Sequence, residues 1–286
     1  MNQVNDLSIS VQKQKEELQE AQSKYKFSSE GSGYFQIRGS NSSMGSPTSK
    51  NPDEKMIVIT APTKRSKRIN TESDVYCCEF NSTGSYFGIA CDDKTIKMYD
   101  ADSFQLKSTF YGSTSDSTHV SFSPNGKFIL GTSTDAACRI WEISTGRSKH
   151  TLTGHAKKIQ SADFTSDSSK IITGSNDRTI KIWEMVHGTC LKTILCQSTC
   201  NDLEVAKSSD IIGSAHFDNS VRFWDPRAGK LVQMIKDLHS QQVTSLAFTK
   251  DGYHLLTNGR DNVLKYVDLR NYKTIHTLQY GVVFGF

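Results

Sequence analysis

The sequence contains no run of about 18 or more apolar residues, so it predicts no membrane-spanning helix. Its first residues, MNQVNDLSISVQKQKEELQ, lack a basic segment followed by an apolar core, which argues against a secretory signal peptide. The net charge of +4 is a small excess of 34 Lys and Arg over 30 Asp and Glu, too mild to indicate nucleic-acid binding. We therefore expect a cytoplasmic chain that does not bind nucleic acid.

The seven cysteines lack the spacing of a metal site. Cys196 and Cys200, and the adjacent Cys77 and Cys78, have no second CxxC or HxxxH partner at zinc spacing. Without a secretory address disulfides are not expected either, because they persist in oxidising compartments. We expect reduced cysteines that pack as small hydrophobic side chains, and no metal or cofactor.

An internal repeat is the main feature that the sequence does contain. In each unit a turn Asp precedes a basic residue by four positions and an aromatic residue or Val by six, and an acidic residue follows. The turn aspartates are Asp93, Asp135, Asp177, Asp218 and Asp261, separated by 42, 42, 41 and 43 residues. Five copies in register indicate one local structure formed five times.

Within a unit, stretches of alternating polarity are separated by polar turns. In the third unit these stretches are IQSADF, KIITGS, TIKIW and TCLKTIL. Four short antiparallel strands in about 42 residues are typical of a β-propeller blade. The sequence therefore predicts an all-β propeller.

The third unit resembles a WD40 repeat, because it carries GH at Gly154–His155 and WE at Trp183–Glu184. The resemblance implies a structural tetrad in which the Trp183 indole bonds a hydroxyl, the hydroxyl bonds His155, and His155 bonds Asp177. Either Thr173 or Ser175 supplies that hydroxyl.

At the same spacing of 22 residues, His239 is expected to pair with Asp261. The first, second and fourth units have Thr71, Ser113 and Cys196 at the His position, so we expect these blades to be held less tightly.

A His, an Asp and a hydroxyl also suggest a Ser-His-Asp triad. We interpret them as structural, because five copies of the Asp exceed the needs of one active site. The sequence has no P-loop, GxSxG or HExxH motif, and we expect no enzyme. A catalytic role for Cys138 or His155 is the rival hypothesis, and it requires loss of turnover without loss of folding on substitution by Ala.

Several longer strings resemble the propeller of the autophagy-related protein 16-like family. These are HTLTGHAKKIQSADF, CQSTCNDLEV, GSAHFDNSVRFWDPR and RDNVLKYVDLR, and the resemblance runs from about residue 73 to 272. It implies a non-enzymatic scaffold that helps to place the conjugate of autophagy-related proteins 12 and 5 at membranes. There the assembled complex attaches a ubiquitin-like modifier to phosphatidylethanolamine, with catalytic thiols supplied by partners. The alternative is an adaptor of another complex, such as a signalling subunit or a substrate receptor of a ubiquitin ligase.

The remaining segments complete a four-part organisation. Residues 1–26 place Val4, Leu7, Val11, Gln14, Leu18, Ala21 and Tyr25 at heptad positions, as in a coiled-coil remnant that forms a homodimer. A solvated helix that never pairs is the alternative. Residues 27–53 are a Gly/Ser-rich linker, disordered by composition, and residues 54–280 are a partial WD40 propeller.

Residues 281–286, GVVFGF, are an atypical tail. The family has seven blades whereas five repeats are readable here, and the helix with which the family captures autophagy-related protein 5 is not readable in residues 1–26. We therefore expect a truncated isoform, a fragment or a gene-model error. Residues 56–62, MIVITAP, would supply an outer strand of the last blade. The basic stretch 63–68, TKRSKR, is a nuclear address, a contact for acidic lipid or a solvated connection.

Recognition by a propeller falls on its loops. The residue before each turn Asp lies on the top rim, and these residues are Asp92, Thr134, Asn176, Phe217 and Arg260. Their mixed character indicates neither a phosphate-binding ring nor a cation site. Phe217 is either an exposed anchor for a protein partner or buried between blades. Asn201 is either its neighbour in that contact or a side chain that stabilises the turn.

Overall fold

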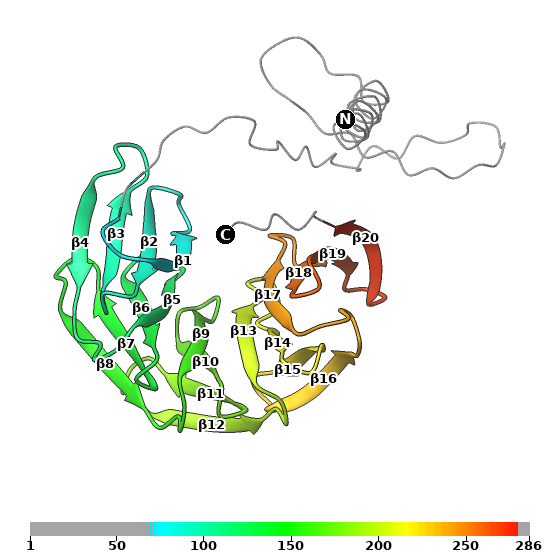
Figure 1. Cartoon of the computed structure of the whole chain (residues 1–286). Helices are drawn as coiled ribbons and strands as arrows, with labels where there is room; N and C mark the ends of the chain where they lie inside the picture. Colours follow the sequence, from blue (N-terminus) through cyan, green and yellow to red (C-terminus); the bar gives the residue numbers. More distant parts are fainter. Residues whose placement is uncertain (1–68, 70, 280–286) are drawn as a thin grey trace, which may run out of the picture. The chain divides into compact units, whose positions relative to one another are not determined.

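The computed structural model describes residue 69 and residues 71–279. The predictions for residues 1–26, 27–53, 56–62, 63–68 and 281–286 lie outside these residues. The described strands belong to one compact unit, Asn70–Phe286. They form five four-stranded antiparallel sheets, each built from four consecutive strands (Figure 1). The predicted all-β propeller architecture is therefore confirmed.

Each sheet is one blade, numbered here from first to fifth. The first blade consists of β1 (Val75–Phe80), β2 (Tyr86–Cys91), β3 (Ile96–Asp100) and β4 (Leu106–Phe110). The second consists of β5 (Ser117–Phe122), β6 (Phe128–Ser133), β7 (Ala137–Glu142) and β8 (Ser148–Thr153). The third consists of β9 (Ile159–Phe164), β10 (Lys170–Ser175), β11 (Thr179–Glu184) and β12 (Cys190–Leu195). The last two are β13 (Cys200–Val205), β14 (Ile212–His216), β15 (Val221–Asp225) and β16 (Lys230–Ile235); and β17 (Val243–Phe248), β18 (His254–Gly259), β19 (Val263–Asp268) and β20 (Lys273–Gln279).

The first strand of each blade is its inner strand. The inner strands β1, β5, β9, β13 and β17 contact one another in chain order, and the blades follow an arc (Figure 1). Among the described strands, β17 and β1 make no contact as extensive as those that join neighbouring blades. Among the described blades, the first and the fifth therefore have one blade neighbour each.

The core lies between successive sheets. Ile172, Ile180 and Ile194 of the third blade pack with Leu203 and Trp224 of the fourth, and all five are buried. Full burial of a large apolar side chain contributes about 1.5–3 kcal/mol, so the interface between blades is a main source of stability.

The end blades lack this cover on one side. Phe80 and Leu278 are each 60% exposed, whereas the corresponding side chains of the third blade, Phe164 and Ile194, are buried. The first and fifth blades therefore each expose an apolar face, whereas the equivalent faces of the third blade are covered by a neighbouring sheet.

No helix among the described residues is long and apolar enough to cross a membrane. Within the same part of the chain, no group of three or more His, Cys, Asp or Glu side chains is arranged to hold a metal ion.

Candidate functional site

The turn between the second and third strands has the same form in all five blades. The residue after each turn Asp has a left-handed backbone: Lys94 (φ 68°), Ala136 (φ 63°), Arg178 (φ 68°), Asn219 (φ 65°) and Asn262 (φ 59°). Such a φ is unfavourable for most side chains, so the turn needs compensating bonds. Asp177 supplies them by accepting the backbone N–H of Thr179 at 2.9 Å and its hydroxyl at 2.6 Å. The repeated Asp is thus first a turn residue.

A chain of hydrogen bonds fixes the turn in the third blade. The Trp183 indole donates to the Thr173 hydroxyl at 2.9 Å, and that hydroxyl lies 2.7 Å from His155 Nε2. His155 Nδ1 lies 2.8 Å from Asp177. An indole only donates and a carboxylate only accepts, so each intermediate group accepts one bond and donates the next.

Of the two candidate hydroxyls, Thr173 takes part in this chain. The Ser175 hydroxyl instead contacts the carbonyls of Lys157 and Lys158, at 3.0 and 2.9 Å. It therefore holds the loop that enters β9, and its own oxygen accepts the N–H of Asp177 at 3.1 Å.

The charge states suit this arrangement. Burial lowers the pKa of His155, although the hydrogen bond to Asp177 opposes the shift, so the imidazole is neutral near pH 7. Burial raises the pKa of Asp177, but the bonds from Thr179, the Ala156 N–H and His155 outweigh it and leave the pKa lowered. A neutral imidazole and an ionised carboxylate match the bond directions.

The fifth blade has the same arrangement without the indole. His239 Nε2 lies 2.9 Å from the Thr257 hydroxyl, and Nδ1 lies 3.0 Å from Asp261. Val267 takes the place of the Trp. Ser240 donates its backbone N–H to Asp261 at 2.9 Å, as Ala156 does to Asp177 in the third blade.

The fourth blade contains a histidine network that the spacing of 22 residues does not predict. Trp224 donates to Ser214 at 2.7 Å, Ser214 lies 2.8 Å from His216 Nε2, and His216 Nδ1 faces the Thr199 carbonyl at 3.2 Å. Burial lowers the pKa of His216 to about 4, so it is neutral. The signal in the sequence is the string HFD, in which the His comes from β14 itself.

In the blades where no His bonds to the turn Asp, the basic residue four positions later forms an ion pair with it. Lys97 pairs with Asp93 at 2.6 Å, and Arg139 pairs with Asp135 at 2.8 Å. Burial raises the pKa of Asp135, but Arg139 and the Thr114 bonds outweigh it and hold the pKa at about 2.

The fourth blade uses the same device, because Arg222 binds Asp218 at 2.5 Å. In the third and fifth blades the equivalent lysines bond elsewhere, Lys181 to the Thr193 hydroxyl and Lys265 to the Leu238 carbonyl. The expectation of weaker blades was based on the missing His alone and gave the basic residue of each unit no role.

The top-rim residues occupy equivalent places. Each donates its backbone N–H to a carbonyl just before the inner strand of its blade, at 3.0–3.1 Å. The pairs are Asp92 with Asp74, Thr134 with Asp116, Asn176 with Lys158, Phe217 with Thr199, and Arg260 with Gln242. The structure thus brings the five predicted rim residues to one end of the blades.

Phe217 and Asn201 differ in their surroundings. Phe217 is 59% exposed, so it is not buried between blades. Asn201 is half-buried in β13, and its amide donates to the Val243 carbonyl at 2.8 Å and to Gln242 at 3.2 Å. Its amide therefore joins the fourth and fifth blades, whereas Phe217 is available for contact.

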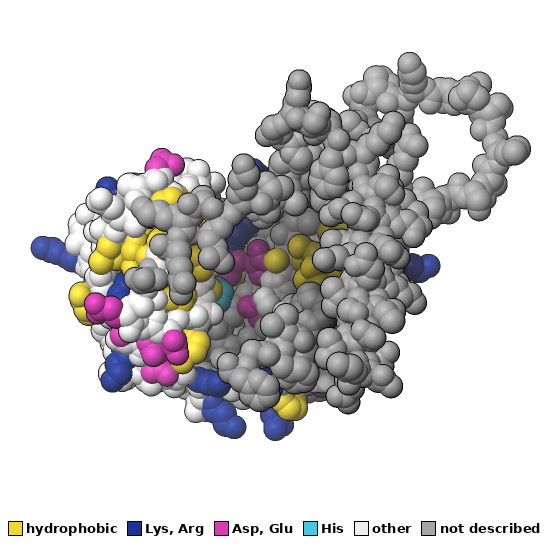
Figure 2. All heavy atoms as spheres, turned by 45° about the horizontal axis from the view of Figure 1, so that its top comes forward, with side chains coloured by type: hydrophobic (Ala, Val, Ile, Leu, Met, Phe, Trp, Pro, Cys, Tyr) yellow, Lys and Arg dark blue, Asp and Glu magenta, His cyan; other side chains and the backbone are white. Residues whose placement is uncertain are grey.

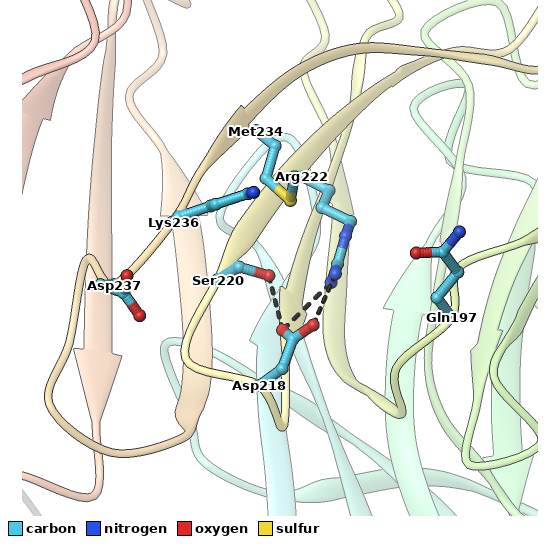
Figure 3. A pocket seen from close by; sticks show the side chains of 7 residues that line it. All are labelled: Gln197, Asp218, Ser220, Arg222, Met234, Lys236 and Asp237. Carbon is cyan, nitrogen blue, oxygen red and sulfur yellow. Dashed lines mark hydrogen bonds and ion pairs between the residues drawn. The ribbon is translucent and has the colours of Figure 1, made fainter.

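A polar pocket of about 290 Å³ is lined in part by Asp218, the residue after Phe217 in the chain (Figure 3). Its lining residues are Gln197, Asp218, Ser220, Arg222, Met234, Lys236 and Asp237. The Asp218 carboxylate is held by Arg222 and by the Ser220 hydroxyl at 2.6 Å. The pocket thus presents charged groups of both signs, of which Asp218 and Arg222 are held by an ion pair.

The residues of the rival enzyme hypothesis are poorly placed for chemistry. Cys138 is fully buried, and burial raises the pKa of its thiol to about 12, so the thiolate nucleophile is scarce. His155 is buried with both ring nitrogens engaged.

Comparison with known proteins places the repeats in a family. The description "WD domain, G-beta repeat" matches residues 64–100, 104–142, 146–184 and 229–268, and the fourth unit, with its different histidine, lies largely outside these ranges.

Three relatives are similar over parts of the chain. Protein tipD of Dictyostelium discoideum is 43% identical over 221 residues, which cover 76% of this chain and 36% of tipD. Autophagy-related protein 16 of Arabidopsis thaliana is 36% identical over 92 residues, 32% of this chain and 18% of that protein. Autophagic-related protein 16.2 of Caenorhabditis elegans is 41% identical over 91 residues, 30% of this chain and 16% of that protein. The chain thus matches about a third or less of each relative, and its matched repeats show that it belongs to the WD domain, G-beta repeat family.

Proposed function

We propose that the chain is a non-enzymatic WD-repeat scaffold of autophagosome assembly. It helps to place the conjugate of autophagy-related proteins 12 and 5 at membranes for lipidation of a ubiquitin-like modifier. One observation carries the proposal: the relatives named as autophagy-related 16 proteins from Arabidopsis thaliana and Caenorhabditis elegans, and protein Atg16l2 of Mus musculus, match at 36–44% identity.

The top rim is the proposed contact surface for membrane-associated protein partners. Phe217 provides an exposed aromatic anchor, the type of residue that dominates binding energy at protein interfaces. Thr134, Asn176, Arg260 and Asn201 surround this end of the blades and would define its polar margin. The Asp218–Arg222 ion pair of the pocket, which starts at the residue after Phe217 in the chain, adds a polar pattern that a partner must match (Figure 3).

The proposal includes a location and an assembly state. The chain would be cytoplasmic and peripheral on forming autophagosome membranes, reached through its partners. Pairing of residues 1–26 as a coiled coil would make it a homodimer and would add avidity to rim contacts.

The test is affinity purification of the tagged full chain from cells, followed by detection of the conjugate and of membrane-associated partners. We expect Phe217→Ala to reduce recovery of the membrane-associated partners several-fold without changing the melting temperature. Tyr253→Ala is the matched control, because Tyr253 is 56% exposed and lies at the opposite end of its blade, in the turn between β17 and β18. Equal loss in both variants, or recovery without the conjugate, would contradict the proposal.

A second candidate is an adaptor of another complex. THO complex subunit 3 of Arabidopsis thaliana is 33% identical over 75 residues, and Transducin beta-like protein 3 of Rattus norvegicus is 34% identical over 68 residues. Recovery of signalling or ligase subunits in the same purification, without the conjugate, would favour this candidate.

A further inference from the structure

The inner strands carry titratable side chains that the proposed scaffold role does not use. At one equivalent position of the five inner strands stand Glu79, Ser121, Asp163, Glu204 and Ala247. Figure 2 shows acidic side chains and a histidine gathered in the hollow between the blades. Bonds from these positions run to the next blade, because Glu204 accepts the Phe248 N–H at 2.7 Å and Asp163 accepts the Val205 N–H at 2.9 Å.

Asp163 is bound as an ionised carboxylate. One oxygen accepts the Phe164 N–H at 2.7 Å and lies 3.1 Å from the Ser121 hydroxyl. The other accepts the Val205 N–H and pairs with the Lys207 ammonium at 2.7 Å. Three other donors, one of them a cation, converge on the buried Asp163, so a proton on this group would displace existing bonds.

The Ser121 hydroxyl contacts two carboxyl groups but has only one proton to donate. Its oxygen lies 3.1 Å from Asp163 and also 3.1 Å from Glu79 Oε1. A hydroxyl has one proton, and an ionised carboxylate can only accept. Both contacts are full two-centre hydrogen bonds only if one carboxyl group is protonated, and the bonding of Asp163 leaves Glu79 as that group. Glu79 Oε1 has one further donor, the Phe122 N–H at 3.4 Å.

The electrostatic surroundings agree with this assignment. Burial and the neighbouring Asp163 raise the pKa of Glu79 to about 7, against lowering by His119, the Phe122 N–H and Ser121. The titratable groups around it come from four strands and one loop: Cys77 and Cys78 on β1, His119 on β5, Asp163 on β9, Asp202 and Glu204 on β13, and Lys207 after β13.

We propose that Glu79, Ser121 and Asp163 share one proton in a bridge that fastens the inner strands of the first three blades, so that attachment of the first blade depends on pH. In the bridge the Glu79 carboxylic acid donates to Ser121, and Ser121 donates to Asp163. Loss of the proton leaves two carboxylates facing one hydroxyl, and the contact between β1 and β5 weakens.

The sign of the pH dependence follows from the raised pKa. The bridge contributes fully below the ordinary Glu pKa of about 4.5, and its contribution is lost as pH rises through about 7. From the bridge alone, which loses about 1 kcal/mol over this range, we expect the melting temperature of the full chain to fall by roughly 2–4 °C between about pH 6.5 and pH 8.5. Burial raises the pKa of Glu204 to about 8, and against the effect of its own burial His119 has its pKa raised to about 10 by Cys77, Asp202 and Glu79, so both groups add changes of the same sign.

Infrared spectroscopy observes protonated carboxyl groups directly, so it can test the bridge separately from these other changes. Infrared spectra of the full chain should show carboxylic acid C=O absorption with two components, which disappear with midpoints near pH 7 for Glu79 and near pH 8 for Glu204, and Glu79→Gln should remove only the first component. The amide of Gln still donates to Ser121, so this variant should fold and lose part of the pH-dependent fall in melting temperature. Glu72→Gln, at an exposed glutamate just before β1, should keep the wild-type band.

Two results would overturn the bridge. One is a component with a midpoint near pH 7 that keeps its full intensity in Glu79→Gln, which would assign that proton to a carboxyl other than Glu79. The other comes from Ser121→Ala, which removes the shared hydroxyl: a band midpoint equal to that of the wild type would exclude Ser121 from the bridge.

Discussion

Replacement of His155 by Ala tests whether the hydrogen-bond chain of the third blade is structural. The substitution removes the bonds to Thr173 and Asp177, at 2.7 and 2.8 Å, in a site where the imidazole is fully buried. Leaving such partners unsatisfied costs about 1–3 kcal/mol. For a folded unit of this size, each kcal/mol lowers the melting temperature by roughly 2–4 °C. We therefore expect a fall of roughly 2–12 °C, measured by calorimetry or circular dichroism on the full chain.

The matched control is His187→Ala, because His187 also pairs with a carboxylate at 2.8 Å but its side chain is 71% exposed. This variant should melt within about 1 °C of the wild type, since exposed pairs contribute little. The pKa of His155 is lowered by burial, so its contribution is present above the unfolded pKa of about 6.5 and is lost as pH falls. The gap between wild type and His155→Ala should narrow from pH 7.5 to pH 5. Equal melting of the two variants at pH 7.5 would refute the structural role.

Three further predictions concern the other blades. His216→Ala should destabilise the chain by about 1–3 kcal/mol in urea titrations, because the bonds of the imidazole to the Ser214 hydroxyl and to the Thr199 carbonyl are lost. Arg139→Met should also destabilise the chain, because Asp135 loses its cation. Since the pKa of Asp135 is held at about 2, the difference in melting temperature between wild type and variant should be present above about pH 3.8 and should disappear as pH falls toward 2. Thermal melts along a pH series measure this difference. Gly131 has in β6 the place that Thr173 has in β10, and the Trp141 indole donates to the Tyr111 carbonyl instead of to a hydroxyl. Gly131→Thr should lower the melting temperature rather than complete a tetrad with Trp141, because an added Cβ would lie 2.6 Å from Ile96.

The repeated architecture could be predicted because its signals are local. A period near 42 residues and a turn Asp in every unit are enough to predict the five blades. The separation of 22 residues between His155 and Asp177 is enough to predict that these two side chains pair, because it is typical of WD40 repeats. His216 was missed because its ring reaches the Ser214 hydroxyl from the same strand, so no fixed separation from Asp218 reveals it. Sequence spacing records the chain path, whereas a hydrogen bond depends on which atoms meet in space.

The replacement of His by a cation was also missed, for a different reason. The basic residue is present in all five units, yet it binds the Asp only where no imidazole competes for the same oxygen atoms. Its role therefore depends on whether a His stands 26 residues earlier, as His155 does for Lys181 and His239 does for Lys265. The proton count at Ser121 required the distances to two carboxyl groups from blades on either side, which no pattern of residue types contains.

The apolar faces at Phe80 and Leu278 have a consequence for how the molecule opens. In a row of units held by nearest-neighbour contacts, a terminal unit has half the attachments of an interior one. Thermal opening should therefore fray inward from the first and fifth blades, with the third blade, which combines the full tetrad with two flanking sheets, as the last to exchange its amide hydrogens.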